Sequence, residues 1–109
     1  MAAFTRVAPV ALLVEEPREL ADFVFDTLGE FAVDDRRREL LRETLRVFLA
    51  TNRGYAATAD QSMVHRNTVH YRVQRAVDHC HLDLDANAFD LHFALTICRR
   101  HGSKVLCRE

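Results

Sequence analysis

A polar and basic stretch lies near the middle of the chain, where residues 61–77 contain three arginines and no acid. Elsewhere acids and bases nearly balance, since the whole chain has 15 Lys and Arg against 16 Asp and Glu. Arginine can donate two hydrogen bonds to guanine, Asn or Gln can pair with adenine, and Thr or Tyr can contact a phosphate or a thymine methyl. The residue types in this stretch therefore predict contact with double-stranded DNA.

Eight side chains of this stretch are candidate DNA contacts, and they divide into two groups. Those expected near bases are Arg66, Asn67, His70, Gln74 and Arg75. Those expected at phosphates are Thr68, Tyr71 and Arg72. Tyr71 and Arg72 could instead have structural roles, because Arg72 lies near the edge of the apolar face. An ordinary solvated helix face is the alternative interpretation of the whole set.

The apolar residues of the same stretch indicate which elements must position these side chains. Val69, Val73, Ala76, Val77 and Cys80 recur close to the helical period, so one face of a helix over about residues 66–80 is committed to a core. A shorter helix from Tyr55 to about Ser62 is expected to precede it. Together they predict a helix-turn-helix at about residues 55–80, whose second helix lies in the major groove.

The connection between these two helices has its own predicted roles. Met63 and Val64 are expected to form the turn and to anchor it in the core. His65 stands where the N-cap of the second helix would fall, and the exposed N–H groups of the following turn favour a phosphate. The small residues Ala57 and Ala59 suit two closely packed helices.

Several runs along the chain together resemble one known family. The matching runs are Leu41-Arg42-Glu43-Thr44-Leu45, Thr58-Ala59, Val64-His65-Arg66-Asn67-Thr68-Val69-His70-Tyr71-Arg72-Val73 and Leu82-Asp83-Leu84. They resemble the C-terminal DNA-binding domain of the PucR/CdaR-type bacterial transcriptional regulators, and weaker similarity extends from about Phe4 to Arg100. The local helix-turn-helix is also similar to that of Fis-type nucleoid proteins.

The resemblance implies the output domain of a transcription factor that binds double-stranded DNA sequence-specifically. It also implies upstream sensory domains, for which this chain has no room. Helix-turn-helix domains gain affinity by pairing on two half-sites, so a homodimer is expected at least on DNA.

Three positions depart from the family pattern. Ser62 replaces the usual Leu at the end of the first motif helix, Ala76 replaces an Ile in the second, and His81 replaces a Gly after it. Each of the two large-to-small changes should weaken packing by about 1–3 kcal/mol. Met63 and Val77 are expected to refill the volume.

Composition sets the broad class. A chain of 109 residues with 49% hydrophobic content, 3 Gly and 2 Pro predicts one globular, largely helical domain. Its apolar run over residues 7–14 is too short to cross a membrane, and no secretory signal is expected. Three cysteines without a CxxC spacing fit a reducing cytoplasm. The net charge of −1 argues against a generally polybasic protein.

The expected fold is all-α, a five- to six-helix bundle containing a Fis-like helix-turn-helix. Residues 1–15 are expected to form a connecting segment, either extended or with a short helix, residues 16–102 the helical DNA-binding domain, and residues 103–109 a flexible tail. A first helix should begin near Pro17 and stop at Gly29, and a second should run from a cap at Asp34 or Asp35 to about Thr51.

Two further expectations concern contacts between these elements. Glu39 with Arg42, and Glu43 with Arg46, have the spacing of i,i+3 ion pairs on a solvated helix face. A last helix from about residue 86 to 100 has an apolar stripe that includes Phe89 and should buttress the recognition unit. Its other stripe members are Leu91, Phe93, Leu95 and Ile97.

Functions other than DNA binding have weaker support in the sequence. A helical dimerisation or protein-interaction module without DNA binding is the alternative, motivated by the near-neutral charge and the departures. An enzyme is not expected, because the chain lacks a Gly-rich phosphate loop and a grouped nucleophile and base, and no cofactor is implied. The one cluster with metal-ligand chemistry is His79, Cys80 and His81 with Cys98 and His101. Cys80 and Cys98 lie on apolar faces, however, so no metal site is expected.

Overall fold

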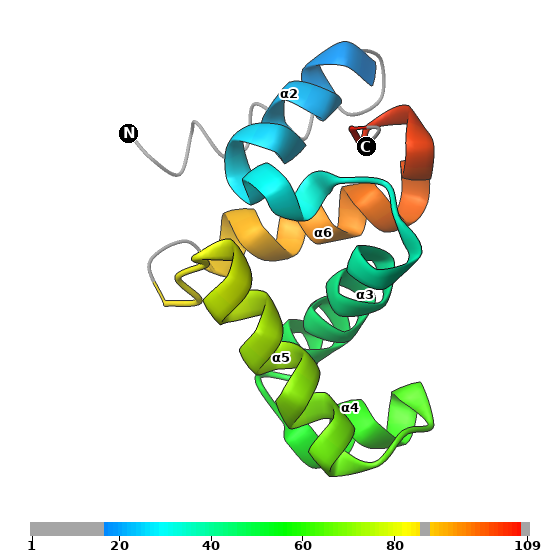
Figure 1. The fold of residues 1–109 in the computed structure, drawn as a ribbon, viewed down its shortest axis with the longest axis vertical. Helices are drawn as coiled ribbons and strands as arrows, with labels where there is room; N and C mark the ends of the chain where they lie inside the picture. The colour runs from blue at the N-terminus through cyan, green and yellow to red at the C-terminus, as the bar shows by residue number, and fades with distance from the viewer. Residues whose placement is uncertain (1–16, 86–87, 108–109) are drawn as a thin grey trace.

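The computed structural model describes residues 17–85 and 88–107. In chain order these contain α2 (Pro17–Leu28), η1 (Gly29–Ala32), α3 (Arg36–Ala50), α4 (Tyr55–Ser62), α5 (Arg66–Cys80), α6 (Ala88–His101) and η2 (Gly102–Lys104), as shown in Figure 1. The predicted all-α class with a helix-turn-helix is confirmed. The expected connecting segment over residues 1–15 lies outside the described residues, so that prediction stays untested.

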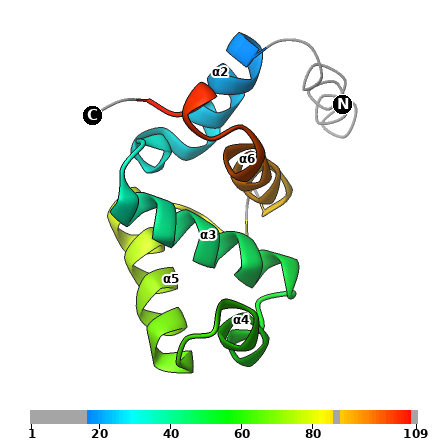
Figure 2. The same cartoon turned by 90° about the vertical axis from the view of Figure 1, so that its right-hand side faces the viewer.

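The helices form two layers. α3, α4 and α5 make a three-helix unit at one end of the molecule, and α2 and α6 cover its other end (Figure 2). Asp35 caps α3 by accepting a hydrogen bond from the Arg38 N–H at 2.7 Å. Gly29 has a φ of +57°, which Gly adopts without strain, so it ends α2 where the sequence predicted.

The core is continuous between the two layers. Buried side chains come from α2 (Leu20, Val24), α3 (Leu45, Phe48), α5 (Val69, Val73) and α6 (Leu91, Leu95). Burying one such side chain contributes about 1.5–3 kcal/mol relative to leaving it exposed. Packing against this core therefore determines how α5 is oriented.

α6 packs mainly on α2 and α3, and α3 in turn packs on α5. The support that α6 was expected to give the recognition unit therefore runs mainly through α3. Phe89 is also not part of the buried stripe, because it lies in the first turn of α6 and its side chain is 61% exposed. Its ring contacts Phe93 at a centroid distance of 5.9 Å.

The segment after α6 packs on the domain as far as the structure describes it, within the range where a flexible tail was expected. Val105 is buried, and the Cys107 N–H donates to the Ala32 carbonyl at 2.9 Å. The Asp34 N–H donates to the Cys107 carbonyl at 2.7 Å, forming an isolated bridge of the parallel type. These hydrogen bonds and the burial of one apolar side chain keep residues 103–107 on the domain, while residues 108–109 lie outside the described ranges.

One predicted ion pair forms and the other does not. Arg46 donates to Glu43 through Nε and Nη2, both at 2.8 Å, as expected. Arg42 is buried instead of pairing with Glu39, and its Nη1 donates to the carbonyls of Phe31 at 2.9 Å and Val33 at 2.7 Å. The helical hydrogen-bond ladder stops at the end of η1, and a long cationic side chain helps to satisfy two carbonyls there.

Candidate nucleic-acid interface

The turn between α4 and α5 has the geometry that the sequence predicted at His65. The His65 Nδ1 accepts a hydrogen bond from the Asn67 N–H at 3.0 Å, and the His65 backbone is extended, as an N-cap requires. Met63 adopts a left-handed conformation with a φ of 57°, and its N–H caps the carbonyls at the end of α4. The left-handed residue Met63 thus ends α4, and the cap at His65 lets α5 begin at Arg66.

Met63 does not anchor the turn in the core, contrary to the prediction. Its side chain is 90% exposed, because the left-handed backbone directs it outward, whereas Val64 packs against the core. Met63 therefore cannot refill the volume next to Ser62.

At the other end of α5, His81 is the C-cap with a φ of 55°. The PucR-type pattern usually has Gly at this position, and the left-handed conformation explains why. A residue with a side chain loses roughly 1 kcal/mol of stability there relative to Gly.

The inner face of α5 is fully committed to the core. Val69, Val73 and Ala76 are buried and Val77 is half-buried. The predicted periodicity is thus confirmed for these four residues, while the side chain of Cys80 lies outside the described set. Because this face cannot move without exposing the core, α5 presents its other face in a defined orientation.

All eight candidate DNA contacts lie on the accessible part of α5. The exposed members are Arg66, Asn67, His70, Tyr71 and Gln74. The half-buried members are Thr68, Arg72 and Arg75. The side chains of Arg66 and Asn67 make no hydrogen bond or ion pair with other described residues, so the first turn of α5 is available to a ligand.

Two of the eight are engaged with neighbouring helices. His70 stacks on Tyr55 of α4, with ring centroids 3.6 Å apart and planes 8° from parallel. Arg72 donates from Nη1 to the Thr44 hydroxyl of α3 at 3.2 Å. These two residues therefore lie at the two borders of the exposed face and connect α5 to the helices on either side.

The second half of the exposed face includes an acid that sequence reasoning left out. Gln74 donates to Asp78 at 2.9 Å, and their i,i+4 spacing is the signal that could have found this pair. Arg75 lies over the Tyr71 ring at 5.7 Å from its centroid, within cation–π range. The first half of α5 thus contains Arg66 and Arg72 and no acid, whereas the second half contains both Arg75 and Asp78.

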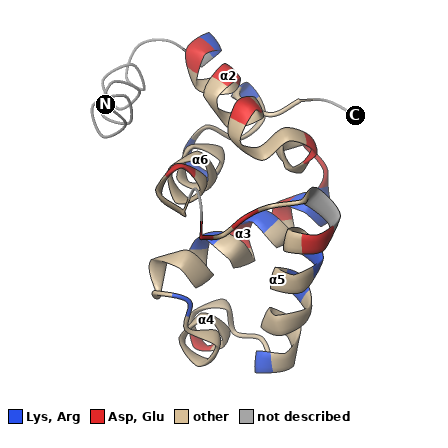
Figure 3. Ribbon diagram, turned by 90° about the vertical axis from the view of Figure 1, so that its left-hand side faces the viewer, with Lys and Arg blue, Asp and Glu red and all other residues tan. Residues whose placement is uncertain are grey.

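Acidic side chains gather on α2, at the end of the molecule opposite the helix-turn-helix. Glu19, Asp22 and Asp26 place acidic charge on α2, far from α4 (Figure 3). α4 and α5 carry only the acids Asp60 and Asp78. A polyanion would therefore be attracted to the end formed by the helix-turn-helix.

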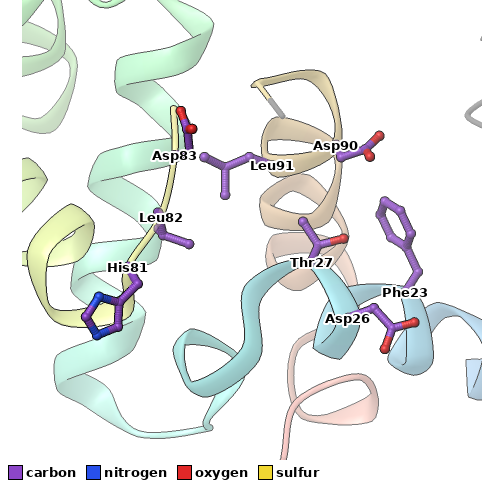
Figure 4. A pocket seen from close by; sticks show the side chains of 8 residues that line it. All are labelled: Phe23, Asp26, Thr27, His81, Leu82, Asp83, Asp90 and Leu91. Atoms are coloured by element: carbon purple, nitrogen blue, oxygen red, sulfur yellow. The ribbon is translucent and has the colours of Figure 1, made fainter. Parts of the chain in front are cut away.

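A separate cavity of about 420 Å³ lies between α2, the α5–α6 connection and α6 (Figure 4). Asp26, Asp83 and Asp90 are among its lining residues, together with His81. The side chains come from elements on the acidic side of the domain, so this cavity does not suit a nucleic acid.

The candidate metal cluster finds no support among the described residues, which contain no group of three suitable ligands. Cys98 is buried, and this burial raises the pKa of its thiol to about 11, so it stays protonated at neutral pH. The side chains of His79 and Cys80 lie outside the described set.

No described helix is both long and apolar enough to cross a membrane.

Comparison with known proteins identifies the family. The family model described as the PucR C-terminal helix-turn-helix domain matches residues 41–97, which include all of α4 and α5. The chain belongs to this family. The transcriptional activator PmfR of Paenarthrobacter nicotinovorans is 38% identical to it over 94 residues, covering 83% of this chain and 20% of that protein. The chain thus spans about a fifth of the length of this curated relative, and no solved structure matches.

Family membership establishes the general role. PucR C-terminal domains are DNA-binding domains of transcriptional regulators and not enzymes, so this domain functions in DNA binding and transcription regulation. The α4–turn–α5 unit described above is the helix-turn-helix of that family.

Proposed function

We propose that this domain recognises a specific double-stranded DNA sequence by inserting α5 into the major groove. The observation that carries the proposal is the division of α5 into a buried apolar face and an accessible face with eight polar or basic side chains. An α-helix fits the width of this groove, and its first turn is the part that approaches base edges in helix-turn-helix proteins.

The two residues best placed to read bases are Arg66 and Asn67. Both are exposed in the first turn of α5, and neither side chain has a partner among the described residues. Arg66 could form the bidentate pair with guanine, and Asn67 the corresponding pair with adenine. Base contacts are also proposed for His70, Gln74 and Arg75. To use both amide atoms on adenine, Gln74 would have to release Asp78.

The phosphate contacts are assigned to Thr68, Tyr71 and Arg72. Thr68 and Arg72 are half-buried at the border of α5 that faces α3, and Tyr71 is exposed beside Arg75. Phosphate contacts fix the register of a domain on the duplex, so residues at the border of the reading face suit this role.

The domain would act within a larger, dimeric regulator. A second copy of the domain would bind an adjacent half-site about one helical turn away, giving a homodimer on DNA. Sensory domains would lie in further sequence, since PmfR is about five times as long as the matched region. By analogy with the printed name of that relative, the regulated output would be activation.

Selection from random-sequence duplexes, followed by affinity measurements at two salt concentrations, tests the proposal. Enrichment of one symmetric motif with salt-sensitive affinity is expected. Arg66→Ala should weaken binding to the selected duplex by about 1–3 kcal/mol and relax preference at one base pair. Arg18→Ala is the matched control, because Arg18 is exposed on α2 at the opposite end of the molecule.

Unchanged affinity in both Arg66→Ala and Arg75→Ala would remove α5 as the reading helix. Salt-sensitive binding without an enriched motif would contradict sequence-specific recognition. No binding at low salt would instead favour the alternative of a helical interaction module.

A further inference from the structure

A hollow of about 390 Å³ lies beside the recognition helix, where α3, the end of α4, α5 and α6 meet (helices labelled in Figure 2). Three arginines from three helices line it: Arg46 of α3, Arg72 of α5 and Arg99 of α6. Glu43 is the one acid among its lining residues. The sequence did not predict this cluster, because its members are up to 53 positions apart (99 − 46) and only the fold brings them together.

Glu43 organises two of these arginines without cancelling the charge of the cluster. Its Oε2 accepts from the Nε of Arg46 at 2.8 Å, and its Oε1 accepts from the Nη2 of Arg46 at 2.8 Å and the Nη1 of Arg99 at 2.5 Å. The hydrogen bond from Arg46 is the main reason that the pKa of Glu43 is lowered. A single carboxylate is therefore shared between two guanidinium groups.

Arg72 adds a third positive charge that no acid neutralises. It is half-buried, and within the described residues its hydrogen-bond partner is the neutral hydroxyl of Thr44. A partly desolvated cation with one neutral partner is favourable only if an anion or water completes its hydrogen bonds. Gln61 and Ser62, at the end of α4, add a side-chain amide and a hydroxyl to the lining.

We propose that this hollow binds a phosphate group through Arg46, Arg72 and Arg99. Guanidinium groups match the geometry of phosphate oxygens, and three positive charges against one carboxylate leave the site cationic. The phosphate could be a diester of the DNA strand that borders the groove occupied by α5, or part of a free phosphorylated molecule. The DNA source rests on the proposed function, whereas phosphate binding itself does not.

The first experiment titrates the folded 109-residue chain with inorganic phosphate at constant ionic strength and follows the arginine Nε–H signals by NMR. Saturable shifts are expected for Arg46, Arg72 and Arg99, with half-saturation in roughly the millimolar range. The signal of Arg100 should not move saturably, because Arg100 is exposed next to Arg99 but does not line the hollow.

The second experiment compares Arg99→Gln with Arg100→Gln, which remove the same charge from adjacent positions. Arg99 is suitable because its side chain is 58% exposed and Glu43 keeps its bonds to Arg46, so the fold should tolerate the change. Arg99→Gln should weaken phosphate binding several-fold and Arg100→Gln should not. If DNA supplies the phosphate, the slope of log affinity for a random-sequence duplex against log salt should also fall by about 0.9 in Arg99→Gln.

The possible results separate the two sources. Loss of phosphate binding with an unchanged salt slope would assign the site to a free phosphorylated molecule. Absence of saturable shifts, together with equal salt slopes in the two variants, would overturn the proposal. The latter result would leave the DNA-reading role of α5 intact, because that role is tested by Arg66 and by sequence selection.

Discussion

The stacked pair of Tyr55 and His70 should hold the two helices of the motif in their relative orientation. The rings are nearly parallel at 3.6 Å between centroids, and Tyr55 also contacts Phe48 of α3 at 4.8 Å. Ring pairs with good geometry contribute about 0.5–1.5 kcal/mol beyond the area they bury. His70→Ala should therefore lower the free energy of unfolding by at least that amount, although His70 is an exposed residue.

A double-mutant cycle isolates the contribution of this pair. Tyr55→Leu also loses the contact with Phe48, so its own effect on stability exceeds that of the stack. The coupling free energy between Tyr55→Leu and His70→Ala, measured by urea unfolding, should be about 0.5–1.5 kcal/mol. A coupling below about 0.3 kcal/mol, the level at which independent sites add, would refute the stacking argument.

DNA binding by the same variant distinguishes a positioning role from base reading. If His70 acts mainly by orienting α5, His70→Ala should weaken binding to all duplexes by a similar factor. If it reads a base, the loss should be confined to sequences with one particular base pair. Asn67→Ala serves as the comparison, because Asn67 is exposed and its side chain has no partner among the described residues.

Two predictions concern buried groups. Arg42→Met should reduce the free energy of unfolding by about 2–4 kcal/mol, because two charge-assisted hydrogen bonds to the Phe31 and Val33 carbonyls are lost; a loss below about 0.5 kcal/mol in urea unfolding would contradict this. Burial raises the pKa of Cys98 from 9.0 to about 11, so its contribution to stability is complete below pH 9 and should be lost as pH rises through 11. Cys98→Ala should flatten this part of the stability profile, and an unchanged profile would argue against the raised pKa.

The helix-turn-helix was largely predictable from the sequence, because local interactions determine it. The bounds of α4 and α5, the N-cap at His65 and the buried face with Val69 and Val73 all match expectation. Apolar spacing and capping chemistry act over a few residues, so a single sequence reports them directly.

The partners of individual charged and apolar side chains were less predictable. Arg42 has the spacing of a surface ion pair, but it is buried because η1 brings two carbonyls over α3. Met63 was expected in the core, but its left-handed backbone directs it to solvent. In both cases the outcome depends on a backbone conformation that residue type alone does not specify.

The sequence by itself therefore determined the fold class, the motif and the polar face of α5. Only the tertiary structure decided that α6 packs mainly on α2 and α3, that Cys107 pairs with the backbone of residues 32–34, and that three distant arginines line one hollow. The physical reason is the range of the interactions. Helical periodicity repeats within each turn, whereas these contacts join residues far apart in the chain and arise only when the whole core is packed.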